Sequence, residues 1–546
     1  MKKVIVLSLS IAFFYCGNNA FACTNLLVGK AASTDGSTII SYSADSHTLY
    51  GELYHWPAAV YPKGSLLNVR EWDTGKFLGQ IAQVEQTYNV VGNINEHQLC
   101  IGETTFGGRS ELKDSTGIID YGSLIFITLQ RAKTAREALQ IMTDLVKEYG
   151  YCSSGESFSV ADPKEVSILE MIGKGPGRKG AVWVAVRLPD DCISAHANQS
   201  RIRTFPLKDK NNCIYSPDVI SFAREMNYFS GKDAEFSFSD TYSPEDFSAI
   251  RGCEGRVWSF FRKYDSGMDK YLPYLKGETK DRLPLWIKPD KKVSVQDVQN
   301  VMRDRFEGTD LDMTKDPGAG PFLCPYRWRP LTYAVDGVEY VNERAIATQQ
   351  TGFTFVAQMR SWLPNEIGGV FWFGVDDAAS CVYVPMYCCM TEIPLCFRVG
   401  NGDLLNYSPT SAFWIFNRVA NAAYGKYSYM IKDIQKVQQE LETSFSDNQL
   451  AIEKAAVEMY VKDKPAAIAF LTDYSCKQAE SSTERWRKLD EYLLVKYIDG
   501  NIKKEKNGQF EKDENGMPVF PLQPGYSEDF YREIINKAGD KLKVVK

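Results

Sequence analysis

CTNLLVGKAASTDGSTIISYSAD, residues 23–45, consists of two apolar runs joined by turn residues, with a cysteine as its first residue. Asp35 and Gly36 stand between the two runs. An Asp-Gly pair flanked by apolar segments is a strong signal for a β-hairpin. The stretch therefore predicts that the folded part of the chain begins as β-sheet directly after Cys23.

The residues before this cysteine have the composition of an export signal. Lys2 and Lys3 form a charged n-region, VIVLSLSIAFFYC forms an apolar h-region, and Ala20-Phe21-Ala22 places small residues where signal peptidase requires them. The h-region is too short to span a bilayer as a helix. We predict that residues 1–22 are a signal peptide. The mature chain would then be exported, to the periplasm or the extracellular space, with no membrane association after cleavage.

Length and charge exclude some classes of protein. The chain has 546 residues, enough for one large or two medium domains. Its net charge is −6, and loss of the two leader lysines leaves −8. No basic stripe counters this charge, so we expect no nucleic-acid partner. Whether the chain forms a homo-oligomer stays open.

The pattern of apolar residues predicts a layered α+β domain over residues 23–409. Strand-like runs come first, then a nearly all-apolar helix at 121–132 and a second helix that begins with a capping box, Thr134 with Glu137. Strand-like runs return at 156–173 and 181–189. Sheet, two helices and sheet again favour an α+β core.

Two further regions differ in composition from this core. Residues 270–335 are rich in charge and proline, which predicts an excursion on the surface. Residues 410–546 are predicted to be helical, because Met430, Ile434 and Val437 recur at the spacing of one helix face.

Cys23 has three readings: a lipid anchor, half of a disulfide, or a nucleophile at a new N-terminus. Ala20 and Phe21 fit a lipobox badly, which favours signal-peptidase cleavage. Cleavage would leave beside the thiol an α-amine with an unperturbed pKa of about 8, and such an amine can act as the base. The chain has only four histidines, and no cysteine has the surroundings of a papain-like nucleophile.

The other cysteines favour neither a metal nor a defined disulfide pattern. Apart from Cys16 and Cys23, eleven remain, so at least one more thiol is free or intermolecular. The group Cys381, Cys388, Cys389 and Cys396 has no C-x2-C unit and no nearby histidine. Buried or bridged cysteines are therefore favoured over zinc, and we predict no metal site.

The stretch at 23–45 resembles the start of N-terminal-nucleophile hydrolases, specifically the family C69 dipeptidases. A second block, VGNINEHQLCIGETTFGGR (91–109), is similar to that family's N-E-x-x-L-x-x-x-E-T-T stretch. The resemblance extends to about residue 400 and, more distantly, to penicillin V and bile-salt amidases. It implies a four-layer αββα sandwich, here followed by a C-terminal helical extension.

The resemblance also implies roles for single residues. Cys23 would be the nucleophile, and Asp45 would contact its amine. Asn198 would support the substrate and the oxyanion, and Arg256 is the candidate for a later active-site arginine, with Arg251 as its rival. The amidases carry an arginine where this chain has Tyr42. Residues expected to bind substrate or form the oxyanion hole are Glu103, Thr104 and Thr105.

The function that this resemblance implies is an exported cysteine dipeptidase that acts on small peptides through an acyl-enzyme, without a cofactor. Two alternatives stay open. One is an acylase of the same mechanism that cleaves penicillin-like or bile-salt-like amides. The other is a non-catalytic lipoprotein anchored through Cys23.

Overall fold

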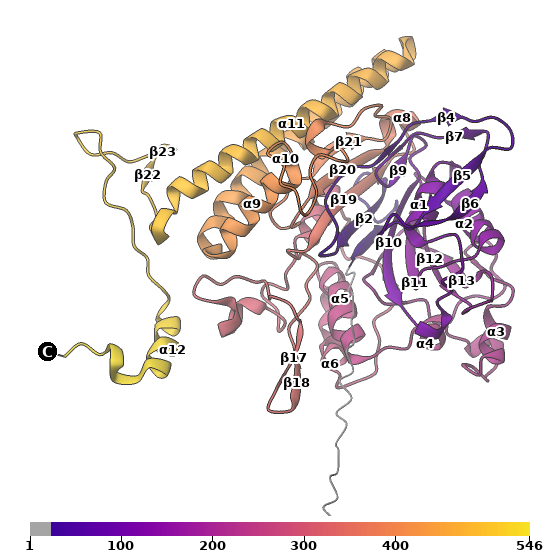
Figure 1. The fold of residues 1–546 in the computed structure, drawn as a ribbon, viewed down its shortest axis with the longest axis horizontal. Coiled ribbons are helices and arrows are strands. Elements are labelled where there is room, and N and C mark those ends of the chain that lie inside the picture. The colour runs from indigo at the N-terminus through magenta and orange to yellow at the C-terminus, as the bar shows by residue number, and fades with distance from the viewer. Residues whose placement is uncertain (1–22, 546) are drawn as a thin grey trace, which may run out of the picture.

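The computed structural model describes residues 23–545, and the predicted signal peptide lies outside the described residues. Two antiparallel β-sheets form the body of the protein (Figure 1). In sheet order, the first contains β16 (Trp286–Ile287), β14 (Ile193–His196), β1 (Asn25–Val28), β2 (Thr38–Asp45), β19 (Thr351–Met359), β20 (Val370–Val375) and β21 (Val384–Tyr387). The second contains β15 (Cys213–Tyr215), β13 (Ala181–Arg187), β12 (Val166–Gly173), β11 (Gly155–Ala161), β10 (Cys100–Gly107), β9 (Ile94–Asn95), β8 (Val90–Val91) and β3 (His55–Trp56).

The two sheets contact each other through β1 and β2 on one side and β10 and β11 on the other. Helices pack against both sheets: α1 (Tyr121–Leu129) and α2 (Ala135–Tyr149) contact the second sheet, and α7 (Val295–Met302) contacts β2 and β19 of the first. The expected α+β class is therefore confirmed. All residues of β1 and β2 are buried, because these strands are covered on both faces.

The predicted hairpin is confirmed. β1 and β2 pair antiparallel, with Leu27 opposite Ile40 and Val28 opposite Ile39. Gly36 has φ +87°, in the left-handed region that glycine enters without steric cost. The hairpin brings the C-terminal end of β2 back to the start of β1, because Thr24 forms a bridge with Ser43.

Strand β1 is central to the first sheet, and this decides the position of Cys23. On its other side β1 pairs with β14, where Asn25 lies opposite His196. The end of β2, the start of β1 and the end of β14 therefore meet at one edge of the sheet. Cys23 precedes β1 there, between Asp45 of β2 and the residues that follow β14.

Both predicted helices of the core are confirmed. α1 is buried over most of its length, as expected from its apolar sequence. Half of the predicted capping box at α2 is present: the Thr134 side chain accepts from the Glu137 N–H, whereas the Glu137 carboxylate accepts from the N–H of Lys133 at 2.7 Å, one residue before the N-cap. Each contact satisfies a backbone N–H that has no partner within the helix.

Residues 270–335 divide into a buried and an exposed part. α7 carries buried Val298, Val301 and Met302 into the core, which charge and proline content did not predict. Every residue but one of the hairpin β17 (Thr332–Val335) and β18 (Val338–Val341) is exposed. This hairpin projects from the body (Figure 1).

The chain after residue 410 begins with long helices, α9 (Ala412–Tyr424), α10 (Tyr427–Lys462) and α11 (Lys464–Lys496). The predicted face of α10 is buried at Met430, Ile434 and Val437. The remainder has little helix beyond α12 (Glu528–Ala538), which buries no residue. No helix in the described part of the chain is long and apolar enough to cross a membrane.

The remaining elements are short. The helices are α3 (Val219–Glu225), α4 (Phe238–Tyr242), α5 (Gly255–Phe261), α6 (Leu272–Leu275) and α8 (Asn365–Gly368). The small hairpins pair β4 (Ala59–Val60) with β7 (Gln86–Thr87), β5 (Leu66–Arg70) with β6 (Phe77–Ala82), and β22 (Glu505–Lys506) with β23 (Gln509–Phe510).

Candidate active site

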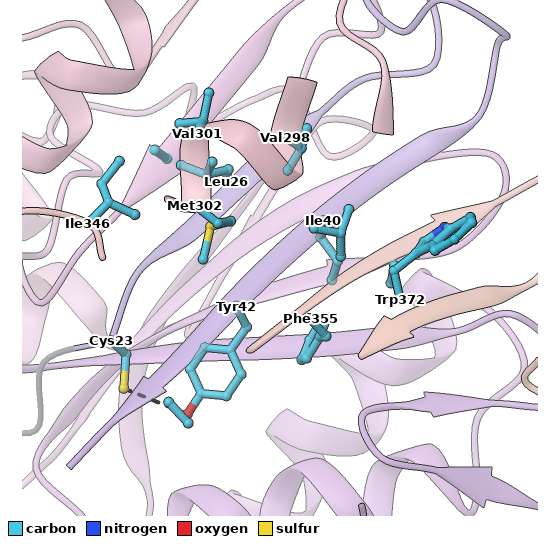
Figure 2. Close-up of a cluster of buried hydrophobic side chains, with 14 of the residues drawn as sticks. Cys23, Leu26, Ile40, Tyr42, Val298, Val301, Met302, Ile346, Phe355 and Trp372 are labelled. Atoms are coloured by element: carbon cyan, nitrogen blue, oxygen red, sulfur yellow. Dashed lines mark hydrogen bonds between the residues drawn. The ribbon is translucent and has the colours of Figure 1, made fainter. Parts of the chain in front are cut away.

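The Cys23 thiol lies in a buried polar environment. Cys23 is only 4% exposed, and its sulfur is 3.6 Å from the Tyr42 hydroxyl (Figure 2). The sulfur is also 3.8 Å from Oε1 of Glu103. Burial, together with the carboxylates of Glu103 and Asp45, raises the pKa of the thiol well above its usual value, while the Asp45 N–H and the Tyr42 hydroxyl lower it. The thiol is therefore protonated near neutral pH and needs a base before it can attack.

Glu103 is a buried carboxyl group in direct contact with this site. Its Oε1 accepts a hydrogen bond of 2.5 Å from the Tyr42 hydroxyl, whereas its Oε2 is buried without a partner among the described residues. Burial raises the pKa of Glu103 to about 7, although the bond from Tyr42 lowers it. Glu103 therefore changes its charge near neutral pH.

A second buried carboxyl group, Glu156, lies beside Glu103. Glu156 is opposite Thr105 in the pairing of β11 with β10, and it accepts a hydrogen bond of 2.8 Å from the Thr105 hydroxyl. Burial and the adjacent Glu103 raise the pKa of Glu156 well above its usual value. Two carboxyl groups this close do not both ionise, so Glu156 retains its proton and Glu103 is the one that ionises.

Asp45 is held in place by three side chains at the end of β2. Its Oδ2 pairs with the Arg344 guanidinium at 2.5 Å and accepts from the Ser43 hydroxyl at 3.1 Å, and its Oδ1 accepts from the Thr351 hydroxyl at 2.6 Å. Asp45 and Arg344 are both buried. The carboxylate is thus fixed beside the residue that the predicted cleavage makes N-terminal.

Arg256 binds the backbone of Cys23. From α5, its Nη1 donates to the Cys23 carbonyl at 2.6 Å and to the Thr24 hydroxyl at 2.9 Å. Its Nη2 donates to the Ala197 carbonyl at 2.9 Å and to Oδ1 of Asn198 at 3.0 Å. Burial and the nearby Arg344 lower the pKa of Arg256 to about 10, so it is still charged at neutral pH. A π-helical turn precedes α5, a local irregularity that often occurs at functional sites.

Asn198 has a backbone conformation that asparagine tolerates better than most residues, with φ +62°. Its Oδ1 accepts from Arg256, and its Nδ2 donates to the Thr105 carbonyl at 2.8 Å. An amide nitrogen has two hydrogens. The second Nδ2 hydrogen has no hydrogen-bond partner among the described residues.

Three other candidate site residues, Thr104, Thr105 and Arg251, differ in whether they lie at the cavity. Thr105 lines the cavity, whereas Thr104 points to the opposite face of β10 and places its hydroxyl 2.7 Å from Nδ1 of His196. The Thr104 side chain therefore does not face the cavity, because side chains alternate along a strand, and its part in substrate binding or the oxyanion hole stays a prediction. Arg251 pairs with Glu343 at 2.6 Å, whereas Arg256 contacts the Cys23 carbonyl.

Five residues of the site, Cys23, Tyr42, Asp45, Glu103 and Thr105, line a cavity of about 200 Å³, which suits a small substrate. Aromatic rings form much of its wall, and three carboxyl groups besides Asp45 face it: Glu52, Asp73 and Glu103. Asp73 accepts a hydrogen bond of 2.8 Å from the Tyr121 hydroxyl. The aromatic wall residues are Tyr42, Tyr50, Tyr54, Trp72, Tyr121 and Phe353.

None of the four histidines supplies a base to Cys23 among the hydrogen bonds of the described residues. His196 lies between the hydroxyls of Thr104 and Ser159, both at 2.7 Å, and burial lowers its pKa to about 3. His55 hydrogen-bonds Asn89 at 2.9 Å. In residues 23–545, no group of three or more His, Cys, Asp or Glu side chains could hold a metal ion, and all twelve cysteines are free.

Several residues of the site had no assigned role in the sequence analysis. Tyr42 was noted only as the replacement of an arginine, yet its hydroxyl contacts both Cys23 and Glu103. Glu156 had a weak signal, the one charged residue in a strand that is otherwise uncharged. Arg344 had none, because it lies 299 residues from the aspartate that it binds.

The chain is similar to known peptidases. A family model described as peptidase family C69 matches residues 22–440. A probable dipeptidase of Salmonella dublin is 28% identical over 406 residues, which cover 71% of this chain and 85% of the relative. A probable dipeptidase of Latilactobacillus sakei is 25% identical, covering 83% and 90% of the two chains. A probable dipeptidase B of Streptococcus pyogenes serotype M1 is 23% identical, covering 90% and 97%. Because the family model matches most of its length, the chain belongs to peptidase family C69.

Proposed function

We propose that the mature chain is an exported cysteine dipeptidase that uses Cys23, freed at its N-terminus, as the nucleophile. The body would then be an αββα sandwich of the N-terminal-nucleophile type, with its helical extension after residue 410. Membership of family C69 and the names of the relatives support this proposal. The apolar leader with its small residues before Cys23 supports export.

The first step transfers the thiol proton to the Cys23 amine. The raised pKa of the thiol makes such a base necessary, and no histidine contacts the sulfur. The Asp45 carboxylate stabilises the ammonium that forms, which favours the transfer. Arg256 is a positioning residue here, because it binds the Cys23 carbonyl and not the reacting atoms.

The sulfur then bonds to the scissile carbonyl carbon, and the carbonyl electron pair moves to oxygen. The remaining Nδ2 hydrogen of Asn198 can stabilise this oxyanion. When the carbon–nitrogen bond breaks, the ammonium of Cys23 returns its proton to the leaving amine. Water next gives a proton to the Cys23 amine and attacks the thioester, which releases the acid and restores the thiol.

The proposal that the substrates are dipeptides rests on one observation. The Glu103 carboxylate lies 3.8 Å from the Cys23 sulfur. In a dipeptide the free α-ammonium lies two bonds from the scissile carbon, about 2.5 Å away. A carboxylate at this position can bind that ammonium, whereas an apolar acyl group would leave it without a partner. The acidic side of the cavity therefore favours a free amine over a penicillin-like or bile-salt-like acyl group.

We expect the processed enzyme to hydrolyse dipeptides such as Ala-Ala and to act poorly on N-acetyl-Ala-Ala, because acetylation removes the charge that Glu103 binds. The Glu103→Gln variant should lose on the order of 10²-fold in kcat/KM for the free dipeptide and little for the acetylated one. Glu156→Gln is the matched comparison and should keep the preference, since Glu156 is already protonated. Steady-state kinetics on both substrates measure this.

The experiment begins with the mass of the purified N-terminus. Unmodified Cys23 at residue one is required, and a diacylglycerol adduct would support the lipoprotein instead. Faster hydrolysis of acylated amino acids than of dipeptides would favour the acylase.

We also expect kcat/KM for dipeptides to fall as the pH drops below about 7, chiefly through a higher KM. Burial raises the pKa of Glu103 to about 7, so below this pH the group is protonated and carries no charge for the ammonium. Tyr42, Cys23 and Glu156 surround it, and Asp73 further raises its pKa. In Glu103→Gln this part of the pH profile should disappear, whereas titration of the Cys23 amine should persist. Identical profiles for the two enzymes would contradict the assignment.

A further inference from the structure

Two buried carboxyl groups share the face of β10 and β11 on which Glu103 contacts Cys23. Thr105 of β10 is opposite Glu156 of β11, and Glu103 precedes Thr105 by two residues. Side chains two apart on a strand share a face, and so do residues directly opposite each other in an antiparallel pair. Glu103 and Glu156 are therefore diagonal neighbours. They are 2% and 1% exposed, so water does not solvate either carboxyl group.

Each of these carboxyl groups has one oxygen in use and one oxygen without a donor. Oε1 of Glu103 accepts from the Tyr42 hydroxyl at 2.5 Å and is the oxygen next to the Cys23 sulfur. Oε1 of Glu156 accepts from the Thr105 hydroxyl at 2.8 Å. Both Oε2 atoms are buried, and no hydroxyl or N–H group of residues 23–545 donates to either of them. Buried oxygens without a donor cost free energy, so two of them on neighbouring groups require an explanation.

One proton between the two groups accounts for both oxygens. A protonated carboxyl group has an O–H donor, whereas an ionised one only accepts. Because the Thr105 hydroxyl donates to Oε1 of Glu156, the proton of Glu156 belongs on Oε2. Burial is the largest influence on both pKa values and raises them, and a hydrogen bond between the two carboxyl groups lowers the pKa of Glu103 and raises that of Glu156.

The other titratable groups around this pair come from several elements. They precede β1, lie in β2, in the turn between β5 and β6 and at the start of α1, and precede β11: Cys23, Tyr42, Asp73, Tyr121 and Tyr151. None of these five side chains is cationic. Hydrogen bonds to Glu103 are therefore the contacts that favour its ionised form.

We propose that Glu156 is a positioning residue that keeps its proton and donates a hydrogen bond from it to Oε2 of Glu103. The inference rests on the proposed dipeptidase function, in which Glu103 binds the substrate ammonium. With Oε2 bonded to Glu156 and Oε1 bonded to Tyr42, the Glu103 carboxylate is held in one orientation. Oε1 then keeps a lone pair on the side of the Cys23 sulfur for the ammonium. The same bond favours the charged form of Glu103 that this ammonium requires.

The test compares two replacements of Glu156 in the processed enzyme. Glu156→Gln keeps an N–H donor for Oε2 of Glu103 and an acceptor for the Thr105 hydroxyl, but it cannot titrate. Glu156→Leu is of similar size and has neither group. The measurement is kcat and KM for Ala-Ala as a function of pH, with thermal unfolding to verify the fold.

In Glu156→Leu the ionised form of Glu103 loses a hydrogen bond, so the acid limb of kcat/KM should move to higher pH by about one unit. At pH 7 kcat/KM should then fall about fivefold through KM, with kcat close to that of the wild type. In Glu156→Gln the limb should stay at its wild-type position. If Glu156 were ionised, either replacement would remove a negative charge beside Glu103 and move the limb to lower pH, and this result would overturn the inference.

Tyr151→Phe is the matched control. The Tyr151 hydroxyl is buried without a partner among the described residues, and burial followed by the charge of Glu156 raises its pKa, so it is near the pair. Its removal should leave the acid limb in place. A shift as large as that of Glu156→Leu would identify Tyr151 as the donor and overturn the assignment of Glu156.

Infrared difference spectra of the wild type and Glu156→Gln test the proton without substrate. On the alkaline side of the Glu103 titration, the wild type should retain the carbonyl band of one protonated carboxyl group that the variant lacks. Absence of this band overturns the inference, even if Glu156→Leu does not fold. If the wild type hydrolyses no dipeptide, the proposed function is wrong and the spectra still decide whether Glu156 holds the proton. If dipeptides are hydrolysed and the acid limb of folded Glu156→Leu does not move, the dipeptidase function stands and Glu156 has no positioning role.

Discussion

Replacing Cys23 by serine is expected to lower kcat/KM for dipeptides by several orders of magnitude while leaving the fold intact. A serine hydroxyl can use the same amine as a base, but it gives up its proton far less readily than a thiol. The site offers little compensation, since burial already disfavours a charged nucleophile and Glu103 and Asp45 oppose it further. The measurement is steady-state hydrolysis by processed protein, with circular dichroism and thermal unfolding to verify the fold.

Cys476→Ser provides the control for loss of a thiol. Cys476 is partly exposed on α11, and its sulfur is 3.9 Å from the Glu392 carbonyl. This variant should keep wild-type activity. Near-normal turnover by correctly cleaved Cys23→Ser would show that Cys23 is not the nucleophile.

The elements that were predicted correctly have sequence signals that lie within a few neighbouring residues. The β1–β2 hairpin follows from an Asp-Gly turn between apolar runs, and α2 begins where Thr134 and Glu137 can cap it. In α10, the buried face follows from apolar residues at helical spacing. Such signals act within a few residues, so they can be read without knowing the fold.

Two features of the fold were not predicted from the sequence. α7 was hidden within a charged, proline-rich region, although Val298, Val301 and Met302 have helical spacing over a short stretch. Residues 501–527 form no helix, and the sequence there is interrupted repeatedly by glycine and proline, which disfavour a helix. Composition averaged over a long window conceals both features.

At the site, residues were predicted but the contacts between them were not. The resemblance named Cys23, Asp45, Asn198 and Arg256, and the structure brings these four together where β1, β2 and β14 end. The partners that give the site its electrostatics come from distant segments: Arg344 for Asp45, and Glu156 beside Glu103. Only strand pairing and tertiary packing could reveal them.

A chain with one extra residue before Cys23 is expected to be nearly inactive. In Met-Cys23 the α-amine becomes an amide, and an amide nitrogen is not appreciably basic. The thiol then loses its proton acceptor, and the contact of an ammonium with Asp45 disappears. Burial that raises the thiol pKa makes this loss severe, because the sulfur has little tendency to ionise unaided. Dipeptide hydrolysis by Met-Cys23 protein, with the methionine verified by intact mass, measures the effect.

Removing the extra methionine with an aminopeptidase should restore the full rate in the same sample, which excludes misfolding as the cause. Equal rates before and after removal would rule out the N-terminal amine as the base. A histidine would be a poor replacement, because His196 is locked between two hydroxyls and His55 is bound to Asn89. Glu103, 3.8 Å from the sulfur and with a pKa of about 7, would then be the remaining base in contact with the thiol. In that case Glu103→Gln would abolish hydrolysis of free and N-acetylated dipeptides alike, whereas a group that binds only the substrate ammonium affects the free dipeptide alone.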